Sequence, residues 1–159
     1  MRLARFIAAN LFLLLATTCF ADDYVLTKVI DGDTVELNGI NGNFKLRLGD
    51  IDAPERNQAY GKKSRRALIK LCKGNGIHVD VIIHGTDKYN RYLGKLQCND
   101  IDAGMYLVEH GFAWHNEKYS NDAIIQNAAL IAREKRIGLW KNKKPIPPWV
   151  WRQQHPHTW

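Results

Sequence analysis

The chain has 159 residues, with 23 Lys or Arg and 16 Asp or Glu, and a formal net charge of +7 at pH 7. This length fits one domain, and a content of 45% hydrophobic and 25% charged residues excludes a disordered chain, a collagen-like repeat or a disulfide-dense miniprotein. The sequence pI of about 9.4 favours an anionic partner, nucleic acid first and an anionic membrane surface second. A basic protein without an anionic partner is the alternative that charge alone leaves open.

Residues 1–21 have the pattern of a secretory signal peptide. A basic start precedes an apolar run over residues 6–16, and residues 19–21 (Cys-Phe-Ala) suit a cleavage site. A membrane anchor and a lipoprotein signal at this cysteine are the alternatives, but the apolar run is short for a membrane span and Asn10 interrupts it. Cleavage removes two arginines and no acid, which lowers the net charge from +7 to +5. We expect a secreted or periplasmic protein with no stable membrane association.

Two cysteines remain in the mature chain, Cys72 and Cys98. An oxidising compartment permits a disulfide between them. Two small buried hydrophobic residues are the alternative, because a disulfide needs Cα atoms within about 7 Å and the sequence does not give that distance.

Strands come first along the mature chain. Residues 24–30 and 34–37 are rich in β-branched residues and are separated by an Asp-Gly-Asp turn. In a third predicted strand, residues 44–48, apolar residues alternate with polar ones. Because side chains alternate across a strand, Arg47 should face away from its leucine neighbours.

A basic amphipathic helix follows, and then further strands and helices. The predicted elements are a helix over residues 59–72, strands over 77–84 and 92–97, a short helix over 103–110, and a longer helix between Asn121 and Gly138. Residues 141–159 are rich in proline and tryptophan, and because proline cannot continue a helix we expect a surface tail without one.

Five short strands with a helix between the third and the fourth favour an α+β fold, an OB-type five-stranded β-barrel with about three helices over residues 22–140. A sandwich or a parallel α/β sheet fits this order less well. A single domain of this kind is expected to be a monomer.

Two acidic clusters adjoin the predicted strands. Asp31 and Asp33 form the first cluster, and Asp50, Asp52 and Glu55 form the second. If the two segments are adjacent, five carboxylates converge, and their repulsion calls for a cation. Oxygen ligands favour Ca²⁺ or Mg²⁺ over zinc. The alternative is that these acids only form turns at strand ends.

Two arginines are candidate phosphate ligands. Arg47 lies shortly before the second acidic cluster, and Arg91 ends the basic and aromatic segment 87–91. A guanidinium group can hold a phosphate through a bidentate pair of hydrogen bonds. Two surface ion pairs of little energetic consequence are the alternative.

Three segments resemble the signature blocks of the staphylococcal nuclease (thermonuclease) family. They are residues 29–35 (Val-Ile-Asp-Gly-Asp-Thr-Val), Arg47 with residues 52–55 (Asp-Ala-Pro-Glu), and residues 87–91 (Asp-Lys-Tyr-Asn-Arg), in matching order and spacing. The similarity runs from about residue 24 to residue 140. It implies an OB-type barrel and a calcium-dependent endonuclease that hydrolyses phosphodiester bonds of DNA and RNA with little sequence preference and leaves 3′-phosphate ends.

The resemblance also assigns calcium ligands. Asp33 and Asp52 match the carboxylate ligands, and Asp31 matches an acid of the outer shell. Ala53 matches a ligand that acts through its backbone carbonyl, where the type member of the family has threonine. Because the backbone carbonyl and not the side chain binds the metal, alanine at position 53 should still provide this ligand.

The remaining roles follow in the same way. Arg47 and Arg91 match the catalytic arginines, and Glu55 matches the general base, or a group that orients the water. The positions expected to contact substrate are Lys88, Tyr89 and Tyr119. A second tyrosine of the family falls at Glu117 here, so base preference is not transferred.

Two other functions stay open. A catalytically silent OB-type nucleic-acid-binding module would be expected to lack some of the carboxylates or arginines, and all of them are present. A cationic membrane-active protein would favour a helix with a broader apolar face than residues 59–72 offer.

Overall fold

The computed structural model describes residues 24–156, so the predicted signal peptide, residues 1–21, lies outside the described residues. The long strands are β1 (Val25–Val29), β2 (Thr34–Gly39), β3 (Gly42–Leu48), β5 (Val79–Thr86) and β6 (Tyr92–Cys98). Three two-residue strands are β4 (Ile51–Asp52), β7 (Ile101–Asp102) and β8 (Trp114–His115). The helices are α1 (Gly61–Cys72), α2 (Ala103–Glu109), α3 (Ala123–Glu134), the 3₁₀ helix η1 (Gly138–Lys141) and α4 (Pro148–Gln154).

The long strands form one mixed sheet in the order β1-β2-β3-β6-β5. Strands β3 and β6 pair in parallel, and the other neighbours are antiparallel. All five strands predicted from the sequence are present, but within residues 24–156 no ladder joins β1 to β5. The α+β class is therefore confirmed, whereas closure of the sheet into a barrel is not.

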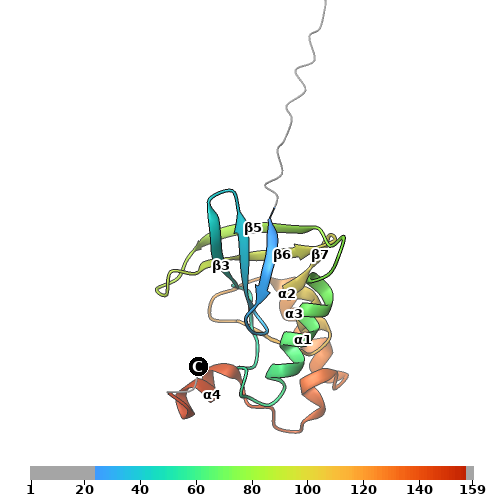
Figure 1. The fold of residues 1–159 in the computed structure, drawn as a ribbon. Helices are drawn as coiled ribbons and strands as arrows, with labels where there is room; N and C mark the ends of the chain where they lie inside the picture. Colours follow the sequence, from blue (N-terminus) through green and yellow to red (C-terminus); the bar gives the residue numbers. More distant parts are fainter. Residues whose placement is uncertain (1–23, 157–159) are drawn as a thin grey trace, which may run out of the picture.

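The core lies between this sheet and helices α1, α2 and α3, which gather on one side of the molecule (Figure 1). Leu46 and Leu48 of β3 are buried in it, and Arg47 between them points the other way, as strand alternation predicts. The side of β3 that carries Arg47 faces the candidate site.

The C-terminal segment differs from the prediction. Residues 148–154 form helix α4, with Pro147 as its N-cap and Pro148 in its first turn. The expectation of a tail without a helix is wrong because proline disrupts a helix interior but suits its first position, where no backbone N–H is needed.

Helix α4 is anchored to the domain rather than trailing from it. The side chain of Gln58 donates a hydrogen bond to the carbonyl of Ile146 at 2.7 Å, and Pro148 is fully buried. The Trp149 ring meets the ring of Trp114 edge-on, with centroids 5.5 Å apart. In Figure 1 the helix lies apart from α1, α2 and α3.

None of the helices within residues 24–156 combines the length and apolar character needed to span a membrane.

Cys72 at the end of α1 and Cys98 at the end of β6 form a disulfide, with their Cα atoms 5.2 Å apart. Both residues are buried in the main core. Of the two possibilities that the sequence left open, the structure adopts the disulfide, which ties α1 to the sheet.

Reduction of this disulfide should destabilise the fold, because the bond restricts the unfolded chain. We expect the free energy of unfolding in urea to fall by about 2–4 kcal/mol when the wild-type chain is reduced. The comparison of oxidised and reduced wild-type protein leaves every side chain in place. Equal midpoints, or two thiols that react with a labelling reagent in the oxidised folded protein, would contradict it.

Candidate active site

Close packing at Gly32 brings the two acidic segments together. A Cβ atom at this position would lie 2.6 Å from the Cβ of Ala53 and 2.8 Å from the Cβ of Ser64. The turn that carries Asp31 and Asp33 therefore packs directly against the second acidic segment and against α1. Only glycine permits this approach.

Hydrogen bonds then fix the two carboxylates of the turn. Asp31 Oδ1 accepts the backbone N–H groups of Asp33 and Thr34 at 3.0 and 2.7 Å. Asp33 Oδ2 accepts the backbone N–H of Ala53 at 2.6 Å, a bond that spans 20 residues of sequence. This bond joins the first acidic cluster to the second, so the two segments are adjacent.

Arg47 lies between the two clusters. Its Nη1 contacts Asp33 Oδ1 at 2.5 Å, and its Nη2 donates to Asp52 Oδ1 at 2.8 Å. Only 13% of the Arg47 side chain and 3% of the Asp52 side chain are exposed. A surface ion pair is thereby excluded for Arg47, because this group is buried and paired with two carboxylates.

Negative charge still exceeds positive charge in this part of the site. Burial, and then the charge of Asp33, raises the pKa of Asp31 to about 7. Burial alone would lower the pKa of Arg47, but the charges of Asp33 and Asp52 outweigh it and raise that pKa. The site therefore favours additional positive charge.

Asp50 does not join the cluster. Its carboxylate lies 3.5 Å from the ammonium group of Lys95, which also contacts Asp122 at 3.2 Å. The expectation that five carboxylates converge is therefore correct for four of them only.

A second arginine enters the site from the C-terminal helix. Arg152 of α4 places Nη2 at 2.7 Å from Asp52 Oδ2 and Nη1 at 3.1 Å from Asp52 Oδ1. The same Nη1 donates to Glu55 Oε1 at 2.8 Å. The sequence did not predict a role for Arg152 because its contacts with Glu55 and Asp52 span 97 and 100 residues. No motif in the surrounding segment, which is rich in proline and tryptophan, indicates that its arginine reaches an acidic site.

Arg91 occupies another part of the same cleft. Its Nε and Nη2 both contact Asp87 Oδ2, at 2.8 and 2.7 Å, in the turn between β5 and β6. Burial alone would raise the pKa of Asp87. Hydrogen bonds from Arg91 and Tyr89 outweigh it and hold this pKa below its usual value. The carboxylate thus stays charged and orients the Arg91 guanidinium group.

One cleft is lined by every residue that the sequence proposed for the site. They are Asp31, Asp33, Arg47, Asp52, Ala53, Glu55, Lys88, Tyr89, Arg91 and Tyr119. Tyr119 is 74% exposed, and Tyr89 is also exposed, as expected of side chains that meet a ligand rather than the core.

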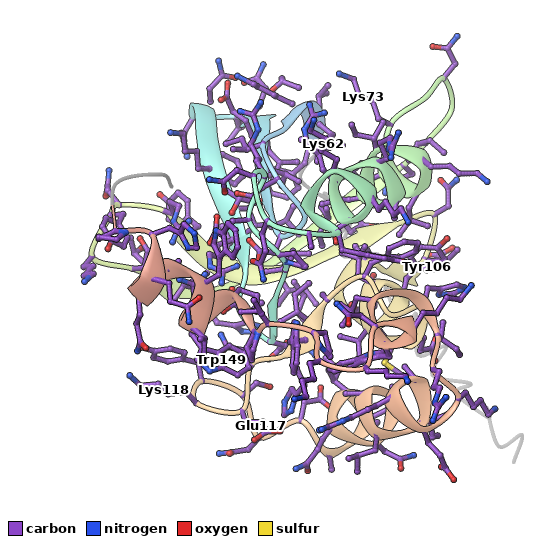
Figure 2. The ribbon with its side chains drawn as sticks, turned by 90° about the horizontal axis from the view of Figure 1, so that it is seen from below. Lys62, Lys73, Tyr106, Glu117, Lys118 and Trp149 are labelled. Carbon is purple, nitrogen blue, oxygen red and sulfur yellow. A yellow bond between two sulfur atoms is a disulfide. The ribbon has the colours of Figure 1, made fainter. Side chains whose placement is uncertain are left out.

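The walls of the cleft come from distant segments. Trp149 and Arg152 of α4 line it together with Glu117 and Lys118 of the loop before α3. Figure 2 shows Trp149, Glu117 and Lys118 on one side of the molecule, and Lys62 and Lys73 at the two ends of α1 on the other. No residue of α1 lines the cleft, so the basic face of this helix is not part of it.

Comparison with known proteins agrees with these features. A family model for staphylococcal nuclease homologues matches residues 45–142, more than half of the chain. The chain therefore belongs to the staphylococcal nuclease family, as its three sequence blocks predicted.

Individual relatives cover most of the chain. It is 35% identical over 130 residues to an uncharacterized endonuclease of Escherichia coli, an alignment that spans 81% of this chain and 84% of that protein. It is 37% identical over 130 residues to an uncharacterized endonuclease of Haemophilus influenzae, spanning 81% and 72%. A staphylococcal-like nuclease of Arabidopsis thaliana is 34% identical over 110 residues, which span 69% of this chain and 33% of that protein.

The packing at Gly32 gives a direct test of how the site is held. Gly32→Ala should lower the free energy of unfolding by about 1–3 kcal/mol, because the new methyl group must displace Ala53 or Ser64. The measurement is urea denaturation followed by circular dichroism. Gly49→Ala is the matched control, since a Cβ there meets nothing within 4 Å. Equal stability of the two variants would contradict the packing argument.

Proposed function

We propose that the mature protein is a calcium-dependent endonuclease that hydrolyses phosphodiester bonds of DNA and RNA with little sequence preference. Membership of the nuclease family supports an endonuclease. The observation that carries the finer proposal is the buried Arg47, held between Asp33 and Asp52, in a cleft that also holds Glu55 and Arg91.

The donor atoms fit a hard divalent cation in type and charge. The carboxylates of Asp33, Asp52 and Glu55 outnumber the two guanidinium groups of Arg47 and Arg152 that pair with them. Asp31, whose pKa is about 7, adds part of a further negative charge, so negative charge is in excess. Within residues 24–156, no group of three or more His, Cys, Asp or Glu side chains is arranged to hold a metal by itself. Backbone oxygen and water must therefore complete the coordination, as Ca²⁺ accepts.

Asp33, Asp52 and the carbonyl of Ala53 would hold the calcium, with Asp31 behind them. Bound there, calcium would supply positive charge beside a phosphate oxygen and so favour attack on an anionic phosphodiester.

The arginines and the glutamate perform the rest of the chemistry. Arg47 and Arg91 neutralise charge on the phosphate oxygens as it shifts in the transition state. Glu55 takes a proton from the attacking water, or orients that water. The water oxygen bonds to phosphorus as the bond to the 5′ oxygen breaks, which yields a 3′-phosphate and a 5′-hydroxyl end.

The exposed residues of the cleft suit substrate binding. Lys88 and Tyr89 lie beside Arg91 in the turn between β5 and β6, where the ammonium group of Lys88 is 5.0 Å from the Tyr89 ring centroid. A basic group next to an aromatic ring suits a terminal phosphate and its nucleotide. Tyr119, an exposed residue that also lines the cleft, suits contact with a base.

We also propose that the protein acts outside the cytoplasm. The signal-like residues 1–21 support this, and so does the disulfide between Cys72 and Cys98, since structural disulfides persist in oxidising compartments.

Calcium should be required for cleavage. We expect plasmid DNA and a structureless RNA to be degraded by the mature chain in calcium, with activity abolished by EGTA and restored by excess calcium. Gel electrophoresis of the products measures this. Binding to DNA without cleavage in calcium would favour the catalytically silent module instead.

Glu55 should be essential to the rate but not to the fold. Glu55→Gln keeps the shape of the side chain but removes its ability to accept a proton, so the cleavage rate constant should fall by about 10²–10⁴-fold. Glu134→Gln, an exposed position at the end of α3 outside the cleft, is the matched control and should cleave like the wild type. A Glu55→Gln variant as active as this control would remove Glu55 from the chemistry.

A further inference from the structure

Helix α4 places the guanidinium group of Arg152 beside Asp52 and Glu55, the proposed metal ligand and the proposed general base. Arg152 donates to both oxygens of Asp52 and to Oε1 of Glu55. One guanidinium group thus contacts a proposed metal ligand and the proposed general base at once.

This position is built into the fold. Gln58 binds the carbonyl of Ile146, Pro148 is buried and Trp149 packs against Trp114, so the start of α4 is fixed one turn before Arg152. Burial alone would lower the pKa of Arg152. The hydrogen bonds and charges of Asp52 and Glu55 outweigh burial and raise this pKa, so the guanidinium group stays cationic.

We propose that Arg152 is an internal competitor of the divalent cation for Asp52 and Glu55 and thereby sets the calcium affinity of the site. This inference rests on the proposed function, because it takes Asp52 as a calcium ligand.

The hydrogen bonds of Asp52 explain why the two cations compete. Its Oδ2 accepts from Arg152, and its Oδ1 accepts from both Arg152 and Arg47. A cation that binds Oδ1 must displace one of its two donors, and a cation that binds Oδ2 lies next to the guanidinium group of Arg152 and is repelled by it.

Arg152 is the group that can leave. Its side chain is 28% exposed, against 13% for Arg47, and Arg47 is held by Asp33 as well as by Asp52. Arg152 can therefore move into solvent, and Asp52 then keeps its contact with Arg47. Departure of Arg47 would instead leave the buried carboxylate of Asp33 without its cation.

Displacement of Arg152 also frees Glu55. While Nη1 of Arg152 donates to Oε1 at 2.8 Å, one acceptor position of the Glu55 carboxylate is occupied and the carboxylate is held against a cation. Cation binding and release of Glu55 from its ion pair are thus linked through one side chain, that of Arg152.

The test is calcium binding itself, measured by isothermal titration calorimetry on the mature chain without nucleic acid. Arg152→Gln should bind calcium at least tenfold more tightly than the wild type, because it removes the competing charge. Arg152→Lys keeps the charge but loses the two-pronged contact, so its dissociation constant should fall between the two.

Arg66→Gln is the matched control. Arg66 is exposed on α1 and does not line the cleft, so the same change in net charge there should leave calcium affinity unchanged. Circular dichroism establishes that each variant is folded, and if Arg152→Gln fails to fold, tighter binding by Arg152→Lys than by the wild type decides the matter.

The outcomes separate the two proposals. If the wild type binds calcium and neither Arg152 variant binds it more tightly, competition by Arg152 is overturned and the proposed function stands. If neither the wild type nor Arg152→Gln binds calcium, the calcium site of the proposed function is overturned, and this inference falls with it.

Discussion

The cleft depends on one buried guanidinium group, that of Arg47, between carboxylates from two separate acidic segments. Asp33 and Asp52 are nearly inaccessible to solvent, and two such carboxylates would repel each other without a cation between them. The ion pairs also join β3 to the turn before β2 and to β4. A group suited to bind phosphate is thus also the group that holds the two acidic segments together.

The chain belongs to the staphylococcal nuclease family, and the structure shows how the residues of the cleft are arranged. The β3 strand aims Arg47 at the acids, glycine at position 32 allows the two segments to touch, and Asp87 orients Arg91 on its own turn. Helix α4 then closes one wall with Trp149 and Arg152. Arg152 of this helix thus adds a cation that contacts two acidic residues of the cleft, Asp52 and Glu55.

Local patterns predict much of this molecule. The ends of the five long strands differ from the sequence prediction by no more than two residues, because alternation and turn composition are local properties. Contacts that depend on tertiary packing are harder to predict. Asp50 pairs with Lys95 instead of joining the cluster, no ladder between the described strands closes the sheet, and Arg152 meets Asp52 across 100 residues of sequence. No periodicity or motif encodes these contacts.

We propose that this cleft hydrolyses phosphodiester bonds with water as the nucleophile. The most direct test is cleavage of a short DNA oligonucleotide by the mature chain in calcium and ¹⁸O-labelled water, with the products analysed by mass spectrometry under single-turnover conditions. We expect one ¹⁸O atom in each new 3′-phosphate and none at the new 5′ end. Label in a 5′-phosphate, or intact oligonucleotide after prolonged incubation with a folded, calcium-loaded protein, would contradict it.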